Sequence, residues 1–172
     1  MQRVLYILFL ALFFSCKQEG TERILNVVNQ SIDFETPGAI CPNKRKAFGG
    51  VCFVSCGNGN EFCPGYTLKL PDTLNNCFLR ICVDLECRKG GRNFGQFLVA
   101  SIQHGAEITY WHPFDINKYS LKKDEWFHVK DSTQVYYTNN FPNNEIRIFG
   151  YDVDKKSYLD IDNLNVVIRK VY

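Results

Sequence analysis

The stretch CFLRICVDLECR, residues Cys77–Arg88, alternates between two kinds of side chain. Its odd-numbered positions are all apolar: Cys77, Leu79, Ile81, Val83, Leu85 and Cys87. Its even-numbered positions are mostly charged: Phe78, Arg80, Cys82, Asp84, Glu86 and Arg88. A period of two is that of a strand with one face on a core and the other in water. The pattern predicts a long strand of an antiparallel sheet whose odd-numbered face is buried.

The chain on both sides of this strand consists of short apolar segments separated by turn residues such as glycine, proline and asparagine. The other segments that we expect to be strands are Ile24–Val28, Ser31–Glu35, Val51–Val54, Tyr66–Leu70, Phe97–Gln103, Glu107–Trp111, Trp126–Val129, Gln134–Thr138, Glu145–Tyr151 and Leu164–Lys170. No segment has a convincing helical period over ten or more residues. Many short strands at modest spacing predict an all-β sandwich or barrel.

The N-terminus has the order of an export signal, with Arg3 before the apolar run Val4–Phe14. The run is shorter than the roughly 20 apolar residues of a membrane-spanning helix, and a short anchor or a buried helix is the alternative. LFFSC, residues Leu12–Cys16, resembles a bacterial lipobox of the looser form familiar in Bacteroidetes. That resemblance implies cleavage before Cys16 and attachment of acyl chains such as palmitate to it.

These boundaries predict three parts of the chain. Residues 1–15 are the signal peptide, residues 16–23 are the lipidated cysteine with its tether, and residues 24–172 are one domain. We expect a lipid-anchored protein of the cell envelope, at the outer membrane or the cell surface. The formal net charge of the chain is only +2, which argues against a nucleic-acid partner.

The chain contains eight cysteines. Besides Cys16 they are Cys41, Cys52, Cys56, Cys63, Cys77, Cys82 and Cys87. Export favours disulfides, and this odd set allows at most three bridges and one free thiol, for which outward-facing Cys82 is the candidate. Cys77 and Cys87 lie about 33 Å apart along a strand, so we expect their partners in the cysteine-rich loops at 41–63. A zinc site in those loops is the alternative.

Five landmarks occur in an order that resembles a known family. They are SIDFE at Ser31–Glu35, PGYTLKL at Pro64–Leu70, the CFLRICVDL strand, DEWFHV at Asp124–Val129 and LDIDNLNVVI at Leu159–Ile168. The series resembles the jelly-roll carbohydrate-binding modules and related domains of Bacteroidetes surface lipoproteins. The resemblance implies an antiparallel two-sheet β-sandwich with a galactose-binding-like jelly-roll fold, in which the first and last strands are neighbours.

The same resemblance implies a structural calcium ion. In such modules the glutamate that follows phenylalanine and an aspartate before the last strand bind the ion, and these residues correspond to Glu35 and Asp162. Asp33, Glu61 and Asp160 are possible further oxygen ligands, because calcium takes 6–8 oxygens. The alternative is that Asp160 and Asp162 are turn residues that accept hydrogen bonds from main-chain amides.

A carbohydrate site needs flat rings beside polar groups, because sugars stack their C–H faces on aromatic rings while their hydroxyls form hydrogen bonds. Tyr110, Trp111 and His112 are the candidate stacking residues. The charged face with Arg80, Asp84 and Glu86 is the candidate source of polar partners. Core packing is the alternative for the rings.

These observations predict a non-catalytic, membrane-anchored glycan-binding lipoprotein. His104, His112 and His128 do not have metalloprotease spacing and no G-x-S-x-G motif accompanies them, so we do not expect an enzyme. The second hypothesis is a structural or protein-binding lipoprotein, an adhesin or accessory subunit that uses the cysteine-rich loops as its contact surface. A small hydrolase is the third.

Overall fold

The structure is a computed structural model that describes residues 24–35, 46–57, 59–63, 65–91, 95–120, 122–141, 143–153, 155 and 157–172. Its strands are β1 (Ile24–Ile32), β2 (Val54–Gly57), β3 (Tyr66–Lys69), β4 (Cys77–Gly90), β5 (Gln96–His104), β6 (Glu107–Phe114), β7 (Trp126–Tyr137), β8 (Glu145–Asp152) and β9 (Tyr158–Val171). A single 3-10 turn in the described residues, η1 (Ile116–Lys118), follows β6. Within these ranges no helix is long and apolar enough to cross a membrane. The expected signal peptide, Cys16 and tether lie outside the described residues.

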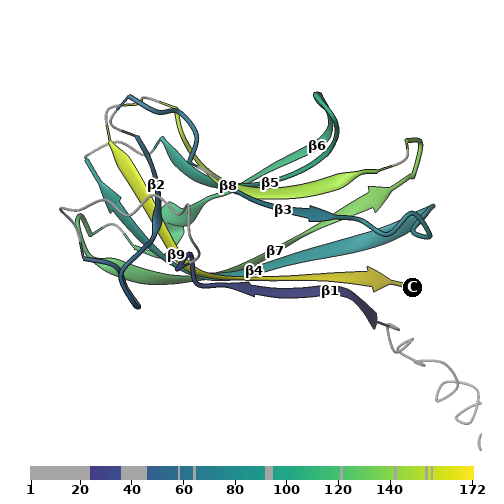
Figure 1. Cartoon of the computed structure of the whole chain (residues 1–172), viewed down its shortest axis with the longest axis horizontal. Helices are drawn as coiled ribbons and strands as arrows, with labels where there is room; N and C mark the ends of the chain where they lie inside the picture. Colours follow the sequence, from purple (N-terminus) through teal and green to yellow (C-terminus); the bar gives the residue numbers. More distant parts are fainter. Residues whose placement is uncertain are drawn as a thin grey trace, which may run out of the picture.

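The described strands form two antiparallel sheets that stack as two layers (Figure 1). One sheet has the order β1-β9-β4-β7, with β2 also pairing with β9, and the other has the order β3-β8-β5-β6. The first and last strands are neighbours, with Ile24 opposite Val171 and Ile32 opposite Leu164. The predicted antiparallel two-sheet β-sandwich is therefore confirmed.

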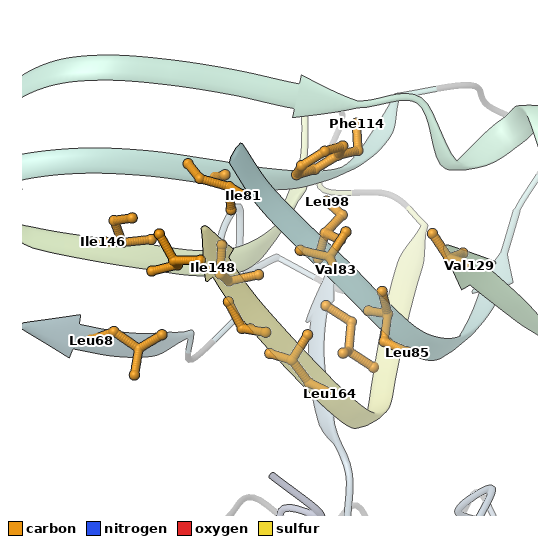
Figure 2. Close-up of a cluster of buried hydrophobic side chains, with 14 of the residues drawn as sticks. Leu68, Ile81, Val83, Leu85, Leu98, Phe114, Val129, Ile146, Ile148 and Leu164 are labelled. Carbon is orange, nitrogen blue, oxygen red and sulfur yellow. The ribbon is translucent and has the colours of Figure 1, made fainter. Parts of the chain in front are cut away.

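The alternation of β4 produces the core. Its odd-numbered residues from Cys77 to Cys87 are buried, and among its even-numbered residues Phe78 is exposed and the others as far as Glu86 are partly exposed. Figure 2 shows Ile81, Val83 and Leu85 of β4 in one cluster with Leu98 of β5 and Ile148 of β8, which come from the opposite sheet. Each sheet thus presents one apolar face to the other, as expected from the period of two.

The alternation ends at Arg88, which is buried although its position predicts exposure to solvent. The reason is that the segment before β2 covers this end of the five-stranded sheet. The Arg88 guanidinium pairs with the carboxylate of Asp160, with Nη2 and Oδ2 2.9 Å apart, and its Nη1 donates to the carbonyl of Lys46 at 2.8 Å. It also lies 4.5 Å from the ring centroid of Trp126 and 5.2 Å from that of Phe53, which is a cation–π arrangement.

The disulfide prediction needs correction. Cys52 is disulfide-bonded, whereas the free cysteines are Cys56, Cys63, Cys77, Cys82 and Cys87. Cys77 and Cys87 were expected to bond with the cysteine-rich loops, but both point from β4 into the core. Cys77 lies at the β4 end opposite Tyr137, and Cys87 is cross-strand from Ile161. Cys82 is partly exposed on the outer face, as its even-numbered position predicts.

Candidate functional site

The candidate stacking residues on β6 point to opposite sides of the strand. Trp111 faces solvent with 40% of its surface exposed. Tyr110 packs against the core cluster, and its hydroxyl is 2.7 Å from Thr133 Oγ1 on β7. His112 stacks parallel to Tyr110 with ring centroids 6.3 Å apart, and burial lowers its pKa. Strand alternation thus separates Trp111 from its two predicted companions.

The candidate polar partners lie on the other sheet. Arg80, Asp84 and Glu86 point outward from β4 in the five-stranded sheet, while Trp111 lies on the outer face of the four-stranded sheet. The two outer faces of a sandwich look in opposite directions, so these side chains do not meet Trp111. Asp84 and Glu86 instead contact His128 on the neighbouring strand β7. His128 lies 2.9 Å from Glu86 Oε1 and 3.3 Å from Asp84 Oδ1. The structure therefore does not bring Arg80, Asp84 and Glu86 together with Trp111.

Trp111 belongs to a cluster of aromatic side chains that we call the aromatic surface, defined as Phe62, Trp111, Phe149 and Tyr151. Phe62 stacks on Tyr151 with centroids 5.0 Å apart and an interplanar angle of 19°. Trp111 meets Tyr151 edge-on at 5.8 Å and 88°, and it meets Phe149 at 5.4 Å and 65°. Phe62 is 49% exposed. The parallel pair of Phe62 and Tyr151 and the perpendicular ring of Trp111 therefore form a corner that is open to solvent.

The local sequence of β8 explains this corner. Ile146 and Ile148 point into the core, so Phe149 and Tyr151 fall in the outward register, and an isolated bridge pairs Phe62 with Tyr151. On β5, Ser101 lies opposite both Trp111 and Arg147. Its small side chain is fully covered, so the larger side chains on both sides of it lie over β5.

A groove of about 520 Å³ runs beside the aromatic surface. Its lining consists of Phe62, Cys63, Gly65, Thr67, Gln103, Ile108, Trp111, Arg147 and Phe149. The Arg147 guanidinium lies 3.3 Å from Glu145 Oε2, and the Gln103 amide donates to the carbonyl of Gly105. A Cβ on Gly65 would lie 2.6 Å from the carbonyl oxygen of Ile148, so only glycine allows the chain to pass this close to β8. The groove combines flat rings with hydrogen-bonding side chains.

The sequence did not single out Phe62, Phe149, Tyr151, Arg147 or Gln103. In the segment EIRIFGYD of β8, the residues after Ile148 place Phe149 and Tyr151 on one face and Gly150 and Asp152 on the other, so the pattern itself suggests that the aromatic face is the buried one. Phe62 reaches the surface through an isolated bridge outside any strand, for which the sequence has no periodic signal.

The two candidate calcium ligands do lie at one place. Glu35 Oε1 accepts hydrogen bonds from the amides of Val51 and Cys52 at 2.7 and 2.9 Å. Asp162 Oδ2 accepts from the amides of Phe48 and Gly49 at 3.0 and 3.1 Å. Both carboxylates therefore hold the same segment, residues 48–52, against the sandwich. Burial, and to a smaller extent the charge of Glu35, raise the pKa of Asp162 above its usual value.

The three further candidate oxygen ligands are engaged elsewhere. Asp33 Oδ1 accepts from the amide of Glu35, Glu61 pairs with Lys155 at 2.9 Å, and Asp160 pairs with Arg88. Across the described ranges, no group of three or more His, Cys, Asp or Glu residues could hold a metal ion. The same observation applies to the zinc alternative for Cys52, Cys56 and Cys63, whereas Cys41 lies outside the described residues.

No protein-family model matches the sequence, and no curated protein matches it significantly. Among solved structures, Family 16 Carbohydrate Binding Module-2 is similar with a TM-score of 0.40 and 13% sequence identity, over 70% of this chain and 79% of that chain. The Stig cyclase Fisc from Fischerella sp. TAU has a TM-score of 0.40 and 15% identity, over 90% of this chain and 78% of that chain.

Proposed function

We propose that this chain is a non-catalytic carbohydrate-binding β-sandwich held on a membrane by a lipid on Cys16. The observation that carries the proposal is the aromatic surface, of which Phe62, Trp111 and Phe149 line a groove. The polar side chains of Thr67, Gln103 and Arg147 line the same groove. Exposure of an aromatic cluster to water is unfavourable, and such clusters on a protein surface commonly mark a contact site for a ligand or a partner. Sugars suit it, because they need both ring faces and hydrogen bonds.

The corner geometry favours a ring-shaped ligand. A pyranose that stacks on Trp111 places its edge toward Phe62 and Tyr151, which lie nearly perpendicular to the indole. Its hydroxyl groups then face the side chains of Arg147 and Gln103. The described lining residues include no aspartate, glutamate or histidine. Because glycoside hydrolysis ordinarily uses a pair of carboxyl groups, this lining supports binding rather than cleavage.

The Trp111→Ala variant tests the proposal. Loss of the stacking ring removes roughly 1–2 kcal/mol of binding free energy, which weakens the affinity by roughly 5- to 30-fold. The full chain, purified in detergent, is applied to a glycan array, and sugars that bind are titrated by calorimetry, which measures the affinity of Trp111→Ala without its indole. Trp126 packs between Phe48, Phe53 and Arg88 and is left unchanged in both proteins.

Tyr136→Ala provides the matched control. Tyr136 is an exposed ring that pairs with Phe78 at 5.1 Å on the other sheet, and its removal leaves the affinity unchanged. Equal weakening by both variants contradicts the proposal. If the wild type binds no sugar on the array, the second hypothesis, a protein-binding lipoprotein, is favoured. Phe48 and Val51 provide exposed apolar surface for such a partner, because 50% and 75% of their surfaces are exposed.

Calcium remains a proposal for Glu35 and Asp162. Two neighbouring carboxylates repel each other, and a cation that binds their remaining oxygens relieves this repulsion. Saturating calcium is expected to raise the melting temperature of the wild type by roughly 5–10 °C over the chelator-treated protein. Asp162→Asn serves as the control and shows no shift. An equal shift in both proteins places the ion elsewhere, and no shift in the wild type shows that calcium does not bind this pair; either result contradicts the proposal.

A further inference from the structure

Two free cysteines lie side by side beneath the aromatic surface. Cys56 and Cys63 are both buried, and the thiol of Cys56 is hydrogen-bonded to Cys63. A Cβ atom on Gly150 would lie 2.8 Å from Cys63 Sγ and 3.2 Å from Cys56 Sγ. Glycine at this position of β8 therefore leaves space that the two sulfur atoms share.

The backbone holds the two cysteines in this arrangement. Cys56 belongs to β2 and pairs with Leu159 of β9 in the five-stranded sheet. The chain then reverses, with reciprocal hydrogen bonds between the backbones of Gly57 and Asn60 at 2.7 and 3.1 Å. Cys63 is fixed on β8, because its amide donates to the carbonyl of Gly150 at 3.1 Å while the Gly150 amide donates to Cys63 Sγ at 2.8 Å. The pair thus connects one sheet with the other.

We propose that Cys56 and Cys63 are a disulfide-forming pair that bonds when the protein meets a small-molecule disulfide such as oxidised glutathione. A disulfide requires the sulfur atoms to be about 2.05 Å apart, and oxidation draws together two atoms that are already in contact. Among the free cysteines in the described part of the chain, Cys56 and Cys63 are the two whose thiols are hydrogen-bonded to each other.

The reaction proceeds by two thiol–disulfide exchanges. The Cys63 thiolate attacks one sulfur of oxidised glutathione, which forms a mixed disulfide and releases one molecule of reduced glutathione. The Cys56 thiolate then attacks Cys63 Sγ, which forms the protein disulfide and releases the second glutathione. The two protein thiols lose two electrons and two protons in all, and the glutathione disulfide gains them.

The order of attack follows from position. Cys63 lines the groove, whereas Cys56 lies behind it. The hydrogen bond with Cys63 and burial both raise the pKa of Cys56 far above its usual value, so Cys56 is the slower nucleophile and resolves the mixed disulfide. The bond forms whether or not the aromatic surface binds a carbohydrate, and it fixes the segment that carries Phe62.

Peptide mapping of the full-length wild type tests the pair directly. The reduced protein is equilibrated with excess oxidised glutathione, its remaining thiols are alkylated, and it is digested after Lys and Glu. Cleavage after Lys46, Glu61 and Lys69 places Cys56 and Cys63 on separate peptides, and a further cut after Phe53 separates Cys52 from Cys56. The expected result is one disulfide-linked product that joins the peptides of Cys56 and Cys63 and separates on reduction.

Two variants and a second readout control the mapping. Cys87→Ser retains the linked product, because Cys87 takes no part, and Cys56→Ser loses it. Oxidation is expected to raise the melting temperature of the wild type roughly 5–10 °C more than that of Cys56→Ser. Alkylation of both thiols in the folded, oxidised wild type overturns the proposal, as does a link from Cys63 to Cys52 or Cys87.

Discussion

Asp162 shows at the residue scale how a single carboxylate fixes a long segment of this protein. Its oxygens accept from the amides of Phe48, Gly49 and Asn163. These donors lower its pKa, but burial has the larger effect and raises it above the usual value. The negative charge is therefore less stable in the folded protein than in the unfolded chain, although its hydrogen bonds organise the segment before β2.

The raised pKa of Asp162 predicts how stability depends on pH. The folded state binds its proton more readily than the unfolded state, so the contribution of this group is fully present below the unfolded pKa and is lost as the pH rises through the folded pKa. Relative to Asp162→Asn, which does not titrate, the wild type is expected to lose free energy of unfolding as the pH rises above the ordinary aspartate pKa of about 4. Urea denaturation of both proteins across this range measures the difference.

Glu107→Gln is the control for this measurement. Glu107 is exposed at the start of β6, and its neutralisation leaves the pH profile parallel to that of the wild type. If the stability difference between Asp162→Asn and the wild type does not change with pH, the burial of Asp162 does not shift its titration.

At the scale of the element, strand alternation determined what the sequence could predict. The pattern of β4 gave the buried face from Cys77 to Cys87 and the outward position of Cys82. The order of the five landmarks gave the pairing of β1 with β9. Alternation says which face of a strand is buried, but not which sheet the strand joins. For that reason Trp111 on β6 was combined with Arg80 on β4, although β4 and β6 lie in different sheets.

Alternation also fails where another element covers the outer face of a strand. Arg88 continues the charged register of β4, yet the segment that contains Lys46 and Phe53 covers it and provides a carbonyl group and a ring. Cysteine spacing has a similar limit. The contact between Cys56 and Cys63 depends on the turn at Gly57–Asn60 and on the absence of a side chain at Gly150. Neither feature follows from a count of cysteines.

At the scale of the whole molecule, the first described strand and the aromatic surface lie on different sheets. β1, the first described strand, is at the edge of the five-stranded sheet, and its start pairs with Val171 at the end of β9 (Figure 1). Trp111 and Phe149 lie on the outer face of the four-stranded sheet. A lipid on Cys16, as proposed above, would tether the sandwich through the sheet that contains β1, whereas the proposed binding groove lies on the other sheet.

This arrangement depends on lipidation of Cys16, which metabolic labelling tests. Bacterial cells that express the full chain and receive an alkyne-tagged fatty acid are expected to label the wild type and to retain it in the membrane fraction, because acyl chains anchor a protein that needs no spanning segment. Cys16→Ser is expected to lose the label. Cys82→Ser, which removes a partly exposed thiol on the sandwich, is expected to keep it. Labelling of Cys16→Ser, or an unlabelled wild type, would show that Cys16 does not carry the lipid, and the argument for a tether at the sheet that contains β1 would then be wrong.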